Sequence, residues 1–240
     1  MLGFPADDSA PQYYEFSPRF PLSTFAGPDS VHIPPAATMV YILLVGAGGG
    51  GGGAFYDGNP ATQRSGGSGY MGSSVTLLIP RQLCPDILAV ELGMGGFGRP
   101  VSGSTGSAGG DGTPTILFGG NNLTELFQAP GGGGGGGASS GVAGAAGVAA
   151  TVPSDTPFSN LAFWDFSATP GWLVSSQFGY PSAFTFHRRP LFLFRASSGP
   201  MFSTTTPSGN FPFAGGGAGG QPTVIPGYNG GHGYALISWW

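Results

Sequence analysis

The chain contains no lysine and only one cysteine, and charged residues make up just 8% of its 240 positions. Without lysine there is no Walker A phosphate loop and no Schiff-base chemistry, because both need its amine. The single Cys84 excludes an internal disulfide framework and a multi-cysteine zinc site. Seven arginines against eleven acidic residues give a net charge of −4, so we expect no nucleic-acid partner.

Long apolar runs and helical periodicity are missing as well. The longest clean apolar run, Met39–Val45, is far shorter than the ~18 residues of a membrane span, so no membrane span is expected. No apolar period of 3.6 residues persists for the ten or so residues that a helix needs. The sequence therefore predicts an all-β protein with almost no α-helix.

Residues that could carry catalysis or bind a metal are scattered along the chain. Each histidine lacks a carboxylate or a second histidine at ligand spacing, and we interpret all three as surface or turn residues: His32, His187 and His232. Four acids lie beside Gly, Pro or Ser, as turn acids do: Asp57, Asp86, Asp111 and Asp155. We therefore predict no catalytic residue, no metal and no cofactor, and the chain is not expected to be an enzyme.

One stretch matches a nucleotide-binding pattern. Residues 46–51 fit G-x-G-x-x-G directly after an apolar strand, which is the setting of a dinucleotide fingerprint. Such a site needs a helix that begins at the glycines and holds the pyrophosphate at its N-terminus. Gly58 and Pro60 break any helix here, so we reject a dinucleotide site.

Glycine and proline dominate what the chain does contain, with 48 and 23 residues respectively. That share usually indicates disorder or low complexity. However, 40% of the residues are hydrophobic and 13% are aromatic, whereas disordered chains are charged and poor in aromatics. The chain is therefore expected to fold, with glycine as its main building material.

The strand patterns divide the chain into an arm and one domain. Residues 1–28 predict an extended arm, because five prolines exclude a long helix. Residues 29–240 predict a glycine-rich β domain that contains an aromatic insertion at about 151–210. Apolar runs with strand-forming residues predict strands at 31–33, 39–45, 73–79, 87–92, 113–118, 123–128, 184–186, 191–195 and 234–240.

Aromatic residues gather in the arm and in the insertion. The arm residues either dock on a neighbouring subunit or pack back on their own domain: Tyr13, Tyr14, Phe16 and Phe20. The insertion residues are candidates for contact with a partner or a receptor, with a core position as the alternative: Trp164, Trp172, Phe178 and Tyr180.

Two glycine runs carry the structural prediction: Gly48, Gly49, Gly50, Gly51, Gly52 and Gly53, and Gly131, Gly132, Gly133, Gly134, Gly135, Gly136 and Gly137. Fixing each glycine costs about 0.5–1 kcal/mol more than fixing alanine, so these runs carry roughly 6–13 kcal/mol of extra entropic cost. We expect such runs in a folded domain only where neighbouring backbones leave no space for any residue other than glycine. Packed polyproline-II-like helices have this property, and their amides must bond to neighbouring runs. A flexible linker is the alternative.

The order of these elements resembles the glycine-rich domain of phage tail fibres and other virion proteins. The residues that carry the likeness are 30–50, 66–80, 88–98, 109–115, 129–137 and 230–240. The resemblance implies a β-sandwich, jelly-roll-like, with packed polyglycine-II helices, often at a fibre tip or particle surface. In adhesin members of that family, loops bind the receptor. Residues 151–210 and the arm depart from the family pattern.

The expected function is therefore that of a virion structural protein, a spike, fibre or decoration subunit at the particle surface, a vertex or a fibre. A role in host attachment through a surface receptor is a further expectation. Its partners would be other copies of itself, in a homo-oligomer, and other virion proteins, because low charge and many aromatics suit extensive burial between chains. The alternative is a cellular glycine-rich protein, either structural or ice-binding.

Overall fold

The computed structural model describes residues 12–16, 29–149, 165–169, 219–222 and 225–240. Within these ranges the regular elements are β-strands, apart from one 3-10 turn at Arg81–Leu83. The prediction of an all-β fold with almost no helix is confirmed for this part of the chain.

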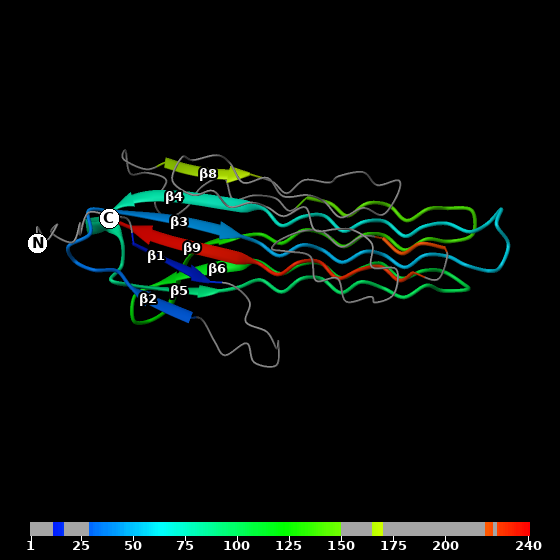
Figure 1. The fold of residues 1–240 in the computed structure, drawn as a ribbon, viewed down its shortest axis with the longest axis horizontal. Helices are drawn as coiled ribbons and strands as arrows, with labels where there is room; N and C mark the ends of the chain where they lie inside the picture. Colours follow the sequence, from blue (N-terminus) through cyan, green and yellow to red (C-terminus); the bar gives the residue numbers. More distant parts are fainter. Residues whose placement is uncertain (1–11, 17–28, 150–164, 170–218, 223–224) are drawn as a thin grey trace, which may run out of the picture.

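The described strands form two antiparallel sheets (Figure 1). The five-stranded sheet has, in spatial order, β1 (Gln12–Phe16), β9 (Tyr234–Trp239), β3 (Met39–Val45), β4 (Ser74–Pro80) and β8 (Asp165–Thr169). The four-stranded sheet has, in spatial order, β2 (Asp29–His32), β5 (Ile87–Glu91), β6 (Thr115–Gly119) and β7 (Thr124–Ala129).

Most of the predicted strands coincide with observed ones. β3 has the predicted bounds, and β2, β4, β5, β6, β7 and β9 differ from prediction by at most two residues at either end. Two observed strands had no strand prediction. β1 lies within the predicted arm, and β8 lies within the predicted insertion. The strands predicted at 184–186 and 191–195 lie outside the described residues.

One hydrophobic cluster draws side chains from both sheets. β4 and β6 alternate between buried and partly exposed residues, so that one face of each strand points to the core. The fully or almost fully buried members include Val40, Ile42, Leu44, Val75, Leu77, Ile79, Leu88, Val90, Leu117, Phe127 and Ile237. Burying each such side chain contributes about 1.5–3 kcal/mol, so this cluster anchors the molecule.

Glycine-rich segments extend from one end of the sheets and form the other half of the molecule (Figure 1). The buried Thr115 lies where the two halves meet. Its Oγ1 donates to the carbonyl oxygen of Val45 at 2.7 Å and accepts the N–H of Gly93 at 3.0 Å. This hydroxyl therefore ties the start of β6 to the end of β3 and to the segment that follows β5.

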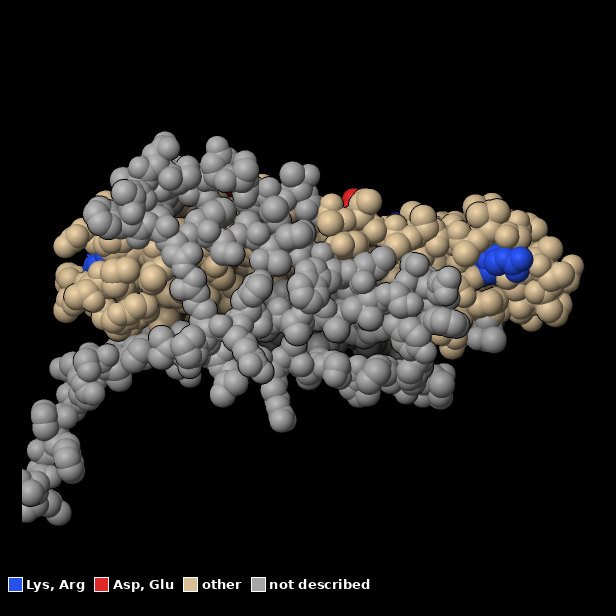
Figure 2. Space-filling view, turned by 90° about the horizontal axis from the view of Figure 1, so that it is seen from above, with Lys and Arg blue, Asp and Glu red and all other residues tan. Residues whose placement is uncertain are grey.

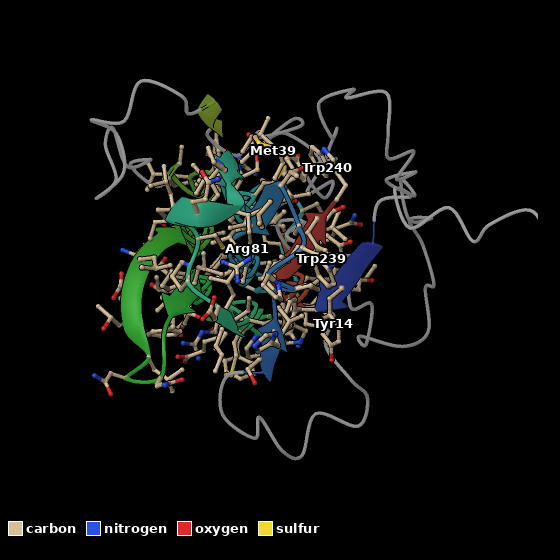
Figure 3. All side chains as sticks on the ribbon, turned by 90° about the vertical axis from the view of Figure 1, so that its left-hand side faces the viewer. Tyr14, Met39, Arg81, Trp239 and Trp240 are labelled. Carbon is tan, nitrogen blue, oxygen red and sulfur yellow. The ribbon has the colours of Figure 1, made fainter. Side chains whose placement is uncertain are left out.

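Arg81 stabilises the opposite end of the sheets, near the centre of the view in Figure 3. Its buried guanidinium donates to the carbonyl oxygens of Pro34, Cys84 and Ile33 at 2.9, 2.9 and 3.0 Å. It also pairs with Asp86 and holds the pKa of that carboxyl below its usual value by hydrogen bonding and charge. The guanidinium thus connects the chain after β2 with the turn between β4 and β5.

Cys84 lies in the same turn and is buried. Burial raises the pKa of its thiol to about 12. Because the thiolate is the reactive form, this cysteine is chemically inert at neutral pH and serves as a small apolar core residue.

We predict that Arg81→Met destabilises the protein by about 2–5 kcal/mol, because three carbonyl oxygens, in two buried hydrogen bonds and one partly buried one, lose their donor. Asp86→Asn should cost less, since the Asp86 side chain is mostly exposed. Urea unfolding followed by tryptophan fluorescence checks both variants. Equal midpoints for Arg81→Met and the unmodified protein would refute this role.

Candidate functional site: the packed glycine segments

Segment 46–54 lies at the centre of the glycine-rich half, and its residues are all buried. From Gly46 to Gly53, every backbone N–H donates to a carbonyl oxygen on another segment of the chain, and three segments share these bonds. Residues three apart donate to the same neighbour, at 2.8–3.2 Å. Gly46, Gly49 and Gly52 donate to the carbonyl oxygens of Ser73, Tyr70 and Gly67, respectively. Ala47, Gly50 and Gly53 donate to those of Thr113, Gly110 and Ser107, and Gly48 and Gly51 donate to those of Gly231 and Tyr228.

Seven carbonyl oxygens of segment 46–54 accept a backbone N–H from another segment, and six of them follow the same three-residue spacing. Those of Ala47, Gly50 and Gly53 accept from Gly132, Gly135 and Ala138, so the two predicted glycine runs lie side by side. Those of Gly48, Gly51 and Ala54 accept from Gly96, Arg99 and Ser102, and that of Gly52 accepts from Gly220. The backbone groups of segment 46–54 therefore form their hydrogen bonds with neighbouring segments, and the pattern repeats every three residues.

These bonds place six stretches of chain around segment 46–54: 65–73, 130–138, 106–114, 93–102, 227–233 and 219–220. Neighbours in this ring also bond to one another. For example, Tyr70 donates to Gly133, Gly112 to Gly132, Gly110 to Phe97, Gly230 to Gly96, and Gly66 to Gly220. Within the described residues, the central segment is thus enclosed by other stretches of chain. Segment 46–54 and these six stretches are called the bundle below.

Segment 141–149 lies outside this ring, over the groove between 65–73 and 130–138. Gly144 and Gly147 donate to Ser65 and Ser68, and Gly136 donates to Ala145. The sequence from Gly141 consists of three Gly-X-Ala triplets. Gly144 and Gly147 face the bundle, whereas Val142 and Val148 are 61% and 76% exposed.

Glycine is needed in these segments because backbones approach too closely for a side chain. A Cβ on Gly49, Gly52 or Gly135 would lie within 3.0 Å of a neighbouring carbonyl group, nearer than real Cβ atoms come. The atoms met are backbone, which has little room to move. Among the described residues, only Gly58, Gly120 and Gly141 are glycines with a positive φ. Space, and not an unusual backbone conformation, accounts for the glycines of the runs.

Side chains complete the hydrogen bonding at the outer grooves of the bundle. The Asp111 carboxylate accepts the N–H of Gly134 at 2.8 Å, and the Asn229 amide oxygen accepts that of Gly98 at 2.8 Å. His232 Nδ1 accepts the N–H of Gly95 at 3.2 Å, and Thr113 Oγ1 accepts that of Met94 at 2.7 Å. These polar residues satisfy backbone donors where no further glycine segment does so.

Sequence reasoning missed this role. Asp111 was predicted to be a turn acid but lies within an extended segment, and His232 was predicted to be a surface or turn residue but is half buried between segments. The physical reason is that a groove at the edge of the bundle leaves N–H groups that need an acceptor. Asn229 and His232 stand three residues apart among glycines, and this spacing is the signal that could have identified them.

Loops cap the far end of the bundle (Figure 1). Asp57 accepts the hydroxyl of Thr62 and the N–H of Asn59, the latter at 2.9 Å, and these hydrogen bonds lower the pKa of its carboxyl. Arg64 donates from Nε to the carbonyl oxygen of Gly141 at 3.0 Å, which joins two of these turns. Charged side chains are sparse on the described surface, as the face in Figure 2 illustrates.

The aromatic residues predicted as contacts fall partly outside the described residues: Trp164, Trp172, Phe178, Tyr180 and Phe20. Tyr13, Tyr14 and Phe16 lie on β1, which pairs with β9 along its whole length. Phe16 is buried in the core cluster, and its ring centroid is 4.7 Å from that of Tyr14. For this part of the arm, packing back on its own domain is what the structure shows.

Within the described ranges, no three His, Cys, Asp or Glu side chains gather as metal ligands would. No helix among those residues has the length and hydropathy needed to cross a bilayer. In comparisons with known proteins, no protein-family model and no curated protein matched this chain.

We predict that Gly52→Ala lowers the free energy of unfolding by about 3 kcal/mol or more, because its Cβ would overlap the Gly136 carbonyl in a packed backbone. Gly103→Ala is the matched control, since the nearest atom to its Cβ, the Tyr56 carbonyl oxygen, lies 3.5 Å away. Its effect should stay within about 0.5 kcal/mol. Chemical unfolding measures both, and similar effects at the two positions would contradict close packing.

A second prediction concerns the edge of the bundle. Asn229→Ala removes the acceptor of the Gly98 N–H and should speed hydrogen exchange at that amide by about 5–10-fold, the equivalent of roughly 1 kcal/mol. Asn121→Ala, in the exposed turn between β6 and β7, should leave Gly98 unaffected. Exchange at Gly98 that is equally slow in both variants would show that Asn229 has no such role.

Proposed function

We propose that this chain is a virion structural protein, a spike, fibre or decoration subunit, built as a jelly-roll-like β-sandwich that carries packed polyglycine-II helices. The observation that carries the proposal is the ring of extended glycine-rich segments around segment 46–54. Its bonding repeats every three residues, and its N–H groups bond to other segments. A polyproline-II-type helix has three residues per turn and no internal hydrogen bonds, so it requires this kind of neighbour.

The sandwich part of the proposal is supported by the packing of the two sheets. Their buried side chains belong to one cluster, with β3 and β4 contributing from one sheet and β5, β6 and β7 from the other. Antiparallel sheets that share a core in this way are typical of sandwich folds.

The bundle suits a surface role because it holds the loops at its far end at a fixed distance from the sheets. At a rise of about 3.1 Å per residue, the eight residues from 46 to 53 would extend roughly 25 Å from the sheets. Each segment is held by several others, so the loops at the far end are carried on a cross-linked support. A loop on a rigid support is a common way to present a binding residue.

Host attachment through a surface receptor is part of this proposal. Met94 and Phe97 follow the three-residue spacing on segment 93–102 and are 41% and 64% exposed. Exposed aromatic and methionine side chains are frequent anchors in interfaces. Trp164, Trp172, Phe178 and Tyr180 stay candidates for the same role. The partners would be further copies of the chain, in a homo-oligomer, and other virion proteins.

One observation favours the alternative of an ice-binding protein. The Gly-X-Ala triplets of segment 141–149 present exposed Val142 and Val148 at a regular spacing. A regular apolar face is what such a protein needs. However, the face is only one segment wide in the described structure, and we therefore place the virion proposal first.

Immunogold electron microscopy tests the proposal with an antibody raised against the purified chain. We expect labelled virus-like particles, at their surface, a vertex or a fibre, in material from the source of this sequence. Light scattering on the purified chain should give the mass of an oligomer. Unlabelled particles together with thermal hysteresis in dilute protein solution would overturn the proposal in favour of ice binding, and unlabelled particles without hysteresis would also reject it.

A further inference from the structure

His232 and Asn229 hold the same two segments together in chemically different ways. Each accepts one backbone N–H from segment 93–102: His232 that of Gly95, and Asn229 that of Gly98. Because the two acceptors and the two donors are both three residues apart, the contacts are successive repeats of one pattern. An amide oxygen accepts at any physiological pH, whereas the imidazole Nδ1 accepts only when it is unprotonated.

We propose that His232 is a pH-sensitive clasp between segments 227–233 and 93–102. In the closed clasp, the lone pair of Nδ1 faces the Gly95 N–H, so the neutral imidazole carries its proton on Nε2. A proton added to Nδ1 turns the acceptor into a donor and sets it against the N–H of Gly95. The hydrogen bond is then lost, and a positive charge stands among packed backbones.

Charged side chains are few on the described segments around His232. Segment 46–54, which packs against segment 227–233, has no charged residue. Segment 93–102 has only Arg99, whose Nε donates to the Ala108 carbonyl oxygen, and segment 106–114 has only Asp111, which accepts from Gly134. Within the described part of the chain, segment 227–233 and the first residue of β9 also carry the phenols of Tyr228 and Tyr234.

The direction of the effect follows from burial, which lowers the pKa of His232 below its ordinary value of about 6.5. An opened segment binds a proton more readily than the closed one. The stabilisation from this contact is therefore complete above about pH 6.5 and is lost progressively as the pH falls below it. The change would open the bundle from one groove, beside the junction with the sheets.

Amide exchange in the full chain from pH 8 to pH 5, corrected for the intrinsic pH dependence of exchange, tests the clasp. The protection of Gly95 should fall by up to about tenfold per pH unit below 6.5, the limit for one proton. His232→Asn is the matched variant, because asparagine already serves as the acceptor at position 229. It should protect Gly95 and abolish the pH-dependent loss.

Two results would overturn the proposal. One is Gly95 protection that does not change with pH in the unmodified chain, and the other is the same pH-dependent loss in His232→Asn. Nitrogen-15 NMR of the imidazole in the unmodified chain gives a test that needs no variant. We expect the Nε2–H tautomer and a pKa below the ordinary value; an Nδ1–H tautomer or an unshifted pKa would contradict the clasp.

Discussion

The glycine-rich half depends on one constraint, which is that an extended segment has no hydrogen-bond partner within itself. Every N–H and C=O of segment 46–54 that is buried must find its partner on another stretch of chain. For the N–H groups the structure meets this demand by close approach, with N···O distances of 2.8–3.2 Å from Gly46 to Gly53. Close approach in turn excludes side chains, so glycine follows from the hydrogen bonding and is not a sign of flexibility.

The sheets reduce the entropic cost of ordering the glycine runs. In an isolated glycine run, the entropic cost of ordering the backbone would exceed the stabilisation from its hydrogen bonds. Here the runs continue from strands that the apolar core already fixes: segment 46–54 follows β3, segment 65–73 precedes β4, and segment 130–138 follows β7. Strand register therefore sets the position of each segment, and Thr115 reinforces the joint. The core and the bundle are thus joined both along the chain and through the hydrogen bonds of Thr115.

Much of the strand framework could be predicted from the sequence, because its signals are local. Met39–Val45 is an apolar, β-rich run followed at once by glycine, and its bounds were predicted without error. β1 was missed because prolines surround it, and its partner β9 lies more than 200 residues away in sequence. A pairing of that kind depends on tertiary structure and leaves no local pattern beyond the aromatics of the arm.

The close packing of glycine segments could be predicted from the sequence, but their positions relative to one another could not. The glycine runs indicated close packing, yet nothing local specified that 46–54 would be central or that 141–149 would lie outside. The same limit explains why Asp111, Asn229 and His232 were not recognised. Their role exists only opposite Gly134, Gly98 and Gly95, on segments that are distant in sequence. Three-residue spacing of polar residues within glycine-rich sequence is the feature to look for.

Hydrogen exchange of the amides from Gly48 to Gly53 in the unmodified protein tests the central claim most directly. If these amides are enclosed and bonded to their neighbours, they should exchange as slowly as those of β3, through global unfolding only. Exchange at the rate of an unstructured glycine peptide would contradict the account, since it would show that the run is solvated and has no fixed partners.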